Sequence, residues 1–296
     1  MKYDVIIIGG GIAGVTAAIY LKRARKNVLL FEEKQIGGQI IEANIVENYP
    51  TYTEIKGYEL GKALNDQLNN LDIPIVNEKV LSIDGEDNNF IINTSDNKYE
   101  CKKVIIATGS SSKTLGLPNE HEYLGKGLSF CATCDGNFFK NKDVAVIGGG
   151  NVALDDVIYL SNIANKVYLI HRRDTFRGES SKVDRIKELN NVEMILNANV
   201  KELKGNGMIE SIDVDQEGNI INLPVSGVFV AVGHMANSSV FTGEKNESGN
   251  IIVDETFETN IPGIYSIGDV IIKEIRQLTT AASDGTIAAM NILKKL

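Results

Sequence analysis

The sequence is poor in the residues that cross-link or stiffen a chain, and it has no excess of positive charge. Only 3 cysteines and 5 prolines occur among 296 residues, and the formal net charge is -9. Three cysteines cannot supply a framework of several disulfides, so a close pair of them indicates catalysis or metal binding. An acidic chain is a poor match for nucleic acid or an anionic membrane, and we expect neither as the main partner.

Long apolar runs are missing as well. No run approaches the ~20 residues that a membrane-spanning helix needs. The N-terminal residues open into a short apolar strand, without the basic and then apolar stretch of a signal peptide. We therefore expect a cytoplasmic protein. Glycine, in contrast, is abundant at 28 residues, and 43% of the residues are apolar. This composition suits two globular domains of strands and helices joined by tight turns.

A pattern of apolar strand, glycine turn and helix occurs twice. In the first copy, residues 4–8 are a nearly continuous apolar run, followed by the turn at 9–14, a helix at 15–23 and a strand at 27–32. Such runs are typical of parallel strands buried on both faces. The second copy has a strand at 143–147, a turn at 148–153, a helix at 154–163 and a strand at 166–171.

The remaining segments complete the predicted architecture. Residues 78–104 alternate and contain turn signals, which indicates short antiparallel strands. We predict an α/β fold with two Rossmann-like, three-layer dinucleotide-binding domains, one inserted into the other. The outer domain comprises residues 1–114 and 244–296, and the inserted domain comprises residues 115–243. Further expected elements are strands at 103–109, 227–232 and 263–267 and a helix at 278–294.

The first glycine turn has the spacing of a dinucleotide-binding site. Gly9 permits the turn, Gly11 lets the backbone approach a pyrophosphate, and Gly14 lets the helix pack closely. Glu32 ends the next strand, where a carboxylate accepts a hydrogen bond from a ribose hydroxyl and repels a 2′-phosphate. This suits FAD or NAD. Taken alone, the same pattern also fits a plain tight turn.

The second glycine turn is followed by charge of the opposite sign. Gly148, Gly150 and Ala153 form the turn, and the next strand leads into arginines instead of an acid. Guanidinium groups bind phosphate through paired N–H donors, which favours NADPH. A solvated basic patch is the alternative. The arginines are Arg172, Arg173 and Arg177.

Cys131 and Cys134 are the redox candidates, because two intervening residues can place both sulfurs at one helix start within bonding distance. Asp135 follows directly and could carry a proton to or from a sulfur, or simply interact with the helix dipole. Half of a zinc site and two buried cysteines without a role are the alternatives. Against zinc, the other cysteine and the histidines are scattered: Cys101, His121, His171 and His234.

Short motifs spread along the whole chain occur together in a fixed order. They are Gly9-x-Gly11-x-x-Gly14, Gly37-Gly38-Gln39, Glu47-Asn48-Tyr49-Pro50, Ala107-Thr108-Gly109, Cys131-Ala132-Thr133-Cys134-Asp135-Gly136, Gly148-x-Gly150-x-x-Ala153, His171-Arg172-Arg173-x-x-x-Arg177, Gly233-His234, Gly268-Asp269 and Arg276-Gln277. With this set the chain resembles the bacterial low-molecular-weight thioredoxin reductases. It departs from them after Gly233-His234, where Met235-Ala236 replaces a usual proline, and at Ser283, near which a glycine often stands.

The resemblance implies two cofactors. FAD would bind the outer domain through Gly9, Gly11, Ala13, Gly14, Glu32, Gly38, Gln39, Asn48, Thr108, Gly109, Asp269, Arg276 and Gln277. NADPH would bind the inserted domain through Gly148, Gly150, Asn151, Ala153, His171, Arg172, Arg173 and Arg177.

The resemblance also implies roles in catalysis. Cys134 would take electrons from the reduced flavin, Cys131 would attack the disulfide of thioredoxin, and Asp135 would be the acid–base group. The family acts as a homodimer whose inserted domain rotates between two states. The expected function is therefore thioredoxin-disulfide reductase. The alternatives are a reductase of another thiol partner, a ferredoxin-fed enzyme independent of NADPH, and a flavin-binding redox sensor without turnover.

Overall fold

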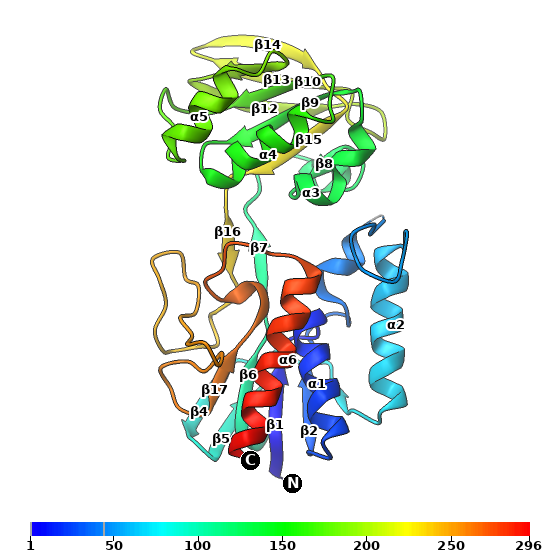
Figure 1. Ribbon diagram of the computed structural model, residues 1–296, viewed down its shortest axis with the longest axis vertical. Coiled ribbons are helices and arrows are strands. Elements are labelled where there is room, and N and C mark those ends of the chain that lie inside the picture. Colours follow the sequence, from blue (N-terminus) through cyan, green and yellow to red (C-terminus); the bar gives the residue numbers. More distant parts are fainter. Residues whose placement is uncertain (1, 44) are drawn as a thin grey trace. The chain divides into compact units, whose positions relative to one another are not determined.

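The computed structural model describes residues 2–43 and 45–296, which divide into two compact units. One unit comprises Met1–Ser111 and Met235–Leu296, and the other comprises Ser112–His234 (Figure 1). These divisions, at 111/112 and 234/235, fall three and nine residues earlier than the expected boundaries at 114/115 and 243/244. The mixed α/β class with parallel sheets is confirmed, whereas the assignment of each unit to one nucleotide stays a prediction.

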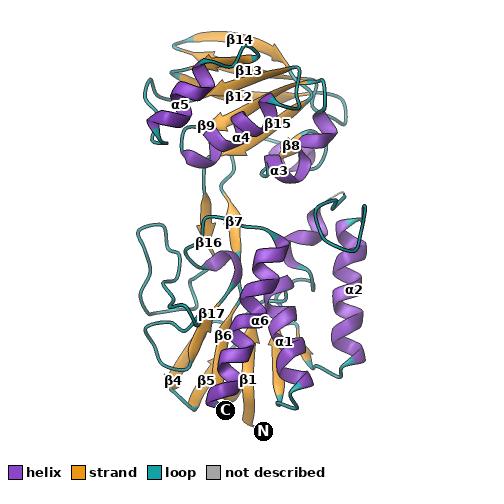
Figure 2. Ribbon diagram, in the orientation of Figure 1, coloured by secondary structure: helices purple, strands orange, loops and turns teal. Residues whose placement is uncertain are grey.

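The first unit is built on a mixed sheet with strand order β3-β2-β1-β6-β5-β4 and with β17 also paired to β6 (Figure 2). Strands β3, β2, β1, β6 and β17 run parallel to one another. At the other edge, β5 pairs antiparallel with β6, and β4 pairs antiparallel with β5. Its elements are β1 (Lys2–Ile8), α1 (Ile12–Arg23), β2 (Val28–Phe31), η1 (Gly38–Glu42), α2 (Gly57–Asn70), β3 (Ile75–Val76), β4 (Ser82–Glu86), β5 (Asn89–Asn93), β6 (Lys98–Ile106), β17 (Ile264–Ser266), η4 (Gly268–Val270) and α6 (Leu278–Lys295).

The central strands of this sheet are buried on both faces. In β1, Val5 and Ile7 belong to the core shared with α1, α2 and α6. Ile6 and Ile8 belong to the core on the opposite face, which includes Phe241. Alternate side chains of a strand point to opposite faces, so burial on both sides requires the unbroken apolar run seen in the sequence.

The second unit contains a parallel sheet with strand order β11-β10-β9-β15-β8 and a separate antiparallel sheet with order β12-β13-β14. Val144 and Val146 of β9 pack with α4 and α5, while Ala145 and Ile147 pack toward the antiparallel sheet. Its elements are η2 (Glu120–Tyr123), β8 (Leu128–Ser129), α3 (Ala132–Asp135), η3 (Gly136–Phe139), β9 (Asp143–Gly148), α4 (Asn151–Ser161), β10 (Lys166–Ile170), α5 (Ser180–Lys187), β11 (Val192–Ile195), β12 (Ala198–Lys204), β13 (Ser211–Gln216), β14 (Asn219–Pro224) and β15 (Gly227–Ala231).

Two short strands form where the chain passes between the units. β7 (Ser110–Ser112) pairs with β16 (His234–Ala236) in a small sheet of their own. Among the described residues, no helix is long and apolar enough to cross a membrane.

The helices that follow the two glycine turns begin earlier than the sequence predicted. α1 starts at Ile12 instead of residue 15, and α4 starts at Asn151 instead of residue 154. The reason is that Gly11 and Gly150 already act as the N-caps in extended conformation, so the last part of each glycine turn belongs to the helix.

Candidate functional site

Cys131 and Cys134 form a disulfide at the start of α3, and their Cα atoms lie 5.3 Å apart. The Cys131 carbonyl accepts hydrogen bonds from the N–H groups of Cys134 at 3.2 Å and Asp135 at 3.1 Å, which closes the turn between the two sulfurs. Both cysteines are half-buried. A pair in this state can exchange two electrons with another dithiol or with a reductant.

Small residues let this turn lie against α4. Ala132 is fully buried, and Gly136 follows the turn directly. A Cβ at Gly136 would lie 3.0 Å from side-chain atoms of Leu160 and of Tyr159, so a side chain there would require these neighbours to move. The disulfide turn is therefore packed closely against α4.

Asp135 lies beside the disulfide turn in a half-buried position. Ser129 Oγ donates a hydrogen bond to Asp135 Oδ2 at 2.6 Å. Burial raises the pKa of the Asp135 carboxyl, and the hydrogen bond from Ser129 lowers it in part. A carboxyl with a raised pKa next to a disulfide is suited to exchange a proton with sulfur.

The first glycine turn is closely packed on one side and open at Gly11. A Cβ on Gly14 would lie 2.0 Å from the carbonyl oxygen of Gly9, whereas a Cβ on Gly11 would meet nothing within 4 Å. Glu32 Oε2 accepts the N–H of Gly10 at 2.7 Å, and its Oε1 accepts the N–H of Lys34 at 2.9 Å. The carboxylate thus also holds the turn, a role that the sequence did not indicate.

Gly38, expected on the flavin side, and Gly268, the neighbour of Asp269, lie against the start of α1. A Cβ on Gly38 would lie 3.5 Å from the Cα of Gly11, and a Cβ on Gly268 would lie 3.1 Å from that of Ala13. Further hydrogen bonds fix the surrounding loops. Gln39 Nε2 donates to the carbonyl of Ser110, Asn48 Nδ2 donates to Gln277 Oε1 at 3.2 Å, and Thr108 Oγ1 donates to the carbonyl of Asn237 at 2.7 Å.

Two polar atoms of this group are buried without a partner among the described residues. They are Asp269 Oδ1 and Arg276 Nε. A buried polar atom without a hydrogen bond is costly, and native proteins rarely leave one without a function. Burial raises the pKa of Asp269, while Lys273 and Arg276 lower it. These atoms can receive hydrogen bonds from, or donate them to, a polar ligand.

The second glycine turn repeats the pattern of the first. A Cβ on Gly148 would lie 2.4 Å from the carbonyl oxygen of Ala231 and 2.8 Å from the Cβ of Ala153, whereas one on Gly150 would meet nothing within 4 Å. Asn151 Oδ1 accepts the N–H of Glu179 at 2.8 Å and links the start of α4 to the loop before α5. The open position again lies at a helix N-terminus, where anions bind favourably.

The arginine loop is fastened to this turn through His171. The buried imidazole packs where Gly149 has no side chain: a Cβ there would lie 2.2 Å from the ring. His171 Nε2 donates to the carbonyl of Thr175 at 3.1 Å, and the ring stacks on Phe176. Burial lowers the pKa of His171, and the nearby arginines lower it further. His171 therefore shapes the loop through its packing and its hydrogen bond to Thr175.

The arginine side chains themselves are exposed to solvent. Arg172, Arg173 and Arg177 are exposed, and in the described part of the chain none of them forms an ion pair. Three free guanidinium groups on one loop can bind an anion such as a phosphate.

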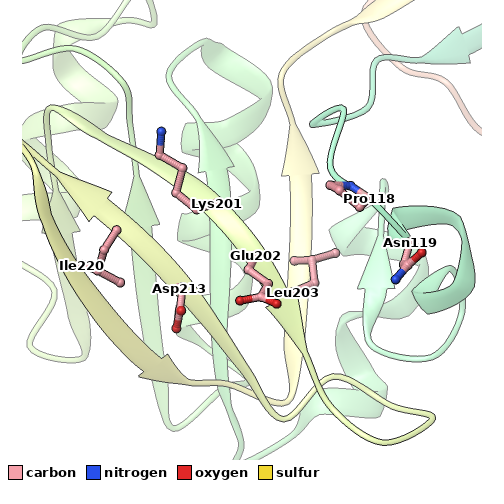
Figure 3. A pocket seen from close by; sticks show the side chains of 7 residues that line it. All are labelled: Pro118, Asn119, Lys201, Glu202, Leu203, Asp213 and Ile220. Carbon is pink, nitrogen blue, oxygen red and sulfur yellow. The ribbon is translucent and has the colours of Figure 1, made fainter.

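A shallow hollow of about 310 Å³ lies elsewhere in the second unit, along the antiparallel sheet (Figure 3). Two of its charged side chains already have partners, since Lys201 lies 3.2 Å from Asp215 and Asp213 lies 2.5 Å from Lys204. None of the residues expected to bind a nucleotide or to react lines it. Its lining residues are Pro118, Asn119, Lys201, Glu202, Leu203, Asp213 and Ile220.

Known proteins resemble the chain over nearly its full length. The family model of the pyridine nucleotide-disulphide oxidoreductases matches residues 3–285. Thioredoxin reductase of Helicobacter pylori is 39% identical over 306 residues, which cover 99% of this chain and 98% of that protein. Thioredoxin reductase of Buchnera aphidicola is 38% identical over 303 residues, which cover 97% and 95%. The crystal structure of thioredoxin reductase from Streptococcus pyogenes matches with a TM-score of 0.94 and 37% identity, covering 100% and 99%.

Proposed function

The chain belongs to the pyridine nucleotide-disulphide oxidoreductase family, and we propose that it is a thioredoxin-disulfide reductase that uses NADPH and FAD. The observation that carries this proposal is the Cys131–Cys134 disulfide beside the half-buried carboxyl of Asp135. The family is an enzyme family that works with flavin and nicotinamide. Its curated relatives over nearly the whole chain include thioredoxin reductases, which favours thioredoxin as the partner.

The geometry of the first unit supports FAD. Gly11 leaves open space at the N-terminus of α1, and Asp269 Oδ1 and Arg276 Nε need partners that polar groups of a bound flavin nucleotide can supply. Glu32 places a carboxylate where a ribose hydroxyl is expected and a 2′-phosphate is repelled. When bound, the flavin supplies two-electron chemistry between a nicotinamide and a disulfide.

The geometry of the second unit supports NADPH over NADH. Gly150 leaves open space at the N-terminus of α4, as Gly11 does at α1. The exposed arginine loop is anchored on the same turn, because the N–H of Arg177 donates to the carbonyl of Gly149 at 2.8 Å. A 2′-phosphate would accept hydrogen bonds from Arg172 and Arg173 and neutralise their charge.

Cys131, Cys134 and Asp135 have different roles in the reduction of the partner disulfide. In the dithiol state, the Cys131 thiolate attacks one sulfur of the partner disulfide, and the other partner sulfur leaves and takes up a proton. Cys134 then attacks Cys131 Sγ, which releases the second partner thiol and restores the Cys131–Cys134 disulfide. Asp135 accepts the proton of the attacking thiol and returns it to a leaving sulfur. Two protons and two electrons pass to the partner in each cycle.

The family resemblance extends the proposal to a homodimer that works in the cytoplasm. It also assigns Cys134 to exchange with the flavin and Cys131 to exchange with the partner. The second candidate, a ferredoxin-fed reductase, is disfavoured by one feature. Such an enzyme has no use for the open turn at Gly150 or for the three exposed arginines.

The decisive experiment is an anaerobic titration with NADPH and then thioredoxin, following flavin absorbance and free thiols. We expect the wild type to bleach with NADPH and to reduce thioredoxin. Cys131→Ser should still bleach but lose thioredoxin reduction, while Cys101→Ser should behave as the wild type. Cys101 is a suitable control because it is fully buried and burial raises its pKa to about 12. Thioredoxin turnover by Cys131→Ser, or bleaching only with ferredoxin, contradicts the proposal.

A further inference from the structure

The Ser129 hydroxyl lies within hydrogen-bond distance of two acceptors at the disulfide turn but has only one proton to donate. Its Oγ accepts the N–H of Cys131 at 3.0 Å. It also lies 2.6 Å from Asp135 Oδ2 and 3.3 Å from the Cys131 carbonyl, both of which are acceptors. Because a serine hydroxyl has one proton, it can donate to only one of them at a time. Ser129 is 4% exposed, so water does not readily replace either of these partners.

The charge of Asp135 decides which acceptor receives the proton. A carboxylate is the stronger acceptor, so ionised Asp135 takes the Ser129 proton at the shorter distance. Protonated Asp135 is itself a donor, and its O–H can point to the free lone pair of Ser129 Oγ. When that O–H is on Oδ2, the atom that faces Ser129, the Ser129 proton turns to the Cys131 carbonyl. Every donor and acceptor remains paired in both arrangements.

The second arrangement disturbs the turn between the sulfurs. The Cys131 carbonyl already accepts the N–H groups of Cys134 and Asp135, which close that turn. A carbonyl oxygen has two lone pairs, so a third donor competes with the two backbone bonds. Proton uptake by Asp135 therefore weakens the backbone hydrogen bonds that close the turn between Cys131 and Cys134.

We propose that Ser129 is a positioning residue that switches its hydroxyl proton between Asp135 and the Cys131 carbonyl, and so couples the proton on Asp135 to the conformation of the disulfide turn. The inference rests on the proposed function, in which Asp135 exchanges protons with sulfur. Coupling of this kind is reciprocal: a change in the turn when the disulfide is reduced changes the proton affinity of Asp135 by the same factor.

The surroundings of Asp135 leave Ser129 as its main polar partner. α3 packs against η3, which has no titratable side chain, and against α4, which carries Asp155, Asp156 and Tyr159. Burial raises the pKa of Asp135, and the hydrogen bond from Ser129 is the feature that lowers it. Removing the hydroxyl should therefore favour the protonated carboxyl.

The test compares the pH dependence of thioredoxin reduction by the holoenzyme in the wild type, Ser129→Ala and Ser129→Thr. Asp135→Asn identifies the limb of the profile that belongs to Asp135. We expect Ser129→Ala to move this limb toward higher pH, whether Asp135 acts as acid or base, and Ser129→Thr to leave it in place. The infrared band of the protonated Asp135 carboxyl in the oxidised enzyme should likewise persist to higher pH in Ser129→Ala than in the wild type.

A matched control separates this role from a structural one. Thr259 Oγ1 accepts the N–H of Ile261 at 3.1 Å and lies 3.2 Å from its carbonyl, the same local pattern as in Ser129 but without a carboxylate. Thr259→Ala should leave the limb unmoved. An unmoved limb in Ser129→Ala, or an equal movement in Thr259→Ala, overturns the proposal. If the wild type does not reduce thioredoxin, the proposed function fails, and the infrared titration alone decides the role of Ser129.

Discussion

Lys273 and Asp284 form an ion pair inside the first unit, with Nζ 2.6 Å from Oδ2 and with side chains that are 12% and 11% exposed. Asp284 lies in α6 and also accepts the N–H of Gly268 at 3.0 Å. The pair thus fastens the segment that begins at Gly268 and contains Asp269 and Arg276 onto α6. Two buried charges are tolerated only when they are paired and hydrogen-bonded.

Lys273→Met should weaken both the fold and the binding of flavin. Loss of the cation leaves Asp284 as a buried charge, which costs about 3 kcal/mol in the free energy of unfolding. It also removes a group that lowers the pKa of Asp269, so that buried carboxyl is ionised to a smaller extent. Chemical denaturation of the flavin-free protein and fluorescence titration with FAD measure the two effects.

The control for Lys273 is an exposed ion pair. Lys79 lies 3.4 Å from Glu33, with side chains 62% and 53% exposed, so Lys79→Met should change neither quantity appreciably. The double variant Lys273→Met with Asp284→Asn should recover part of the lost stability, because no unpaired charge remains. Equal losses of stability and of FAD affinity in Lys79→Met and Lys273→Met would show that the buried pair has no special role.

Gly11 and Gly14 should respond differently to a methyl group. Gly14→Ala places a Cβ 2.0 Å from the Gly9 carbonyl, so we expect the flavin-free protein to lose about 1–3 kcal/mol of stability. Gly11→Ala meets no protein atom within 4 Å and should keep the unfolding midpoint, but it fills the space where a pyrophosphate would lie. Flavin content and denaturation curves distinguish the two. Wild-type flavin affinity in Gly11→Ala would show that the nucleotide does not approach this turn.

The arginine loop should determine the preference for NADPH. Replacing Arg172 and Arg173 with alanine removes charge-assisted hydrogen bonds to a 2′-phosphate, so the KM for NADPH should rise roughly tenfold or more while the KM for NADH changes little. Arg185, an exposed arginine on α5, is the control, and Arg185→Ala should leave both constants unchanged. Equal changes with both nucleotides would exclude phosphate recognition by the loop.

Local patterns in the sequence predicted the glycine turns and the cysteine pair, because each depends on residues a few positions apart. Contacts over long separations could not be predicted in this way. Asn237 Nδ2 donates to the carbonyl of Thr108 at 3.1 Å, and no pattern links those two positions. Asp284 left one visible signal, since it is a charged residue between Ala281 and Ala288 on the apolar face of α6. Its partner Lys273 was not identifiable from the sequence.

Asp156, on α4, should make stability depend on pH. Burial raises its pKa from 3.8 to about 7, and the neighbouring charge of Asp155 adds to the rise. The folded state therefore holds a proton that the unfolded chain releases near pH 4. The contribution of Asp156 to stability is therefore greatest below that pH, falls as pH rises toward about 7, and is lost above it. Asp156→Asn, which mimics the protonated side chain, should raise the free energy of unfolding at pH 8 by on the order of 2–4 kcal/mol.

At pH 3 the wild-type carboxyl is protonated in both states, so Asp156→Asn should then have little effect on the free energy of unfolding. Asp155→Asn removes the like charge and should make stability fall over a narrower pH range. Asp155 also forms an ion pair with Lys182. Because the Asp155 side chain is exposed to solvent, loss of that ion pair costs little. Denaturant unfolding of the three proteins from pH 3 to pH 8 provides the comparison. Destabilisation by Asp156→Asn at pH 8 would mean that the folded protein stabilises the ionised carboxylate, the opposite of what its burial implies.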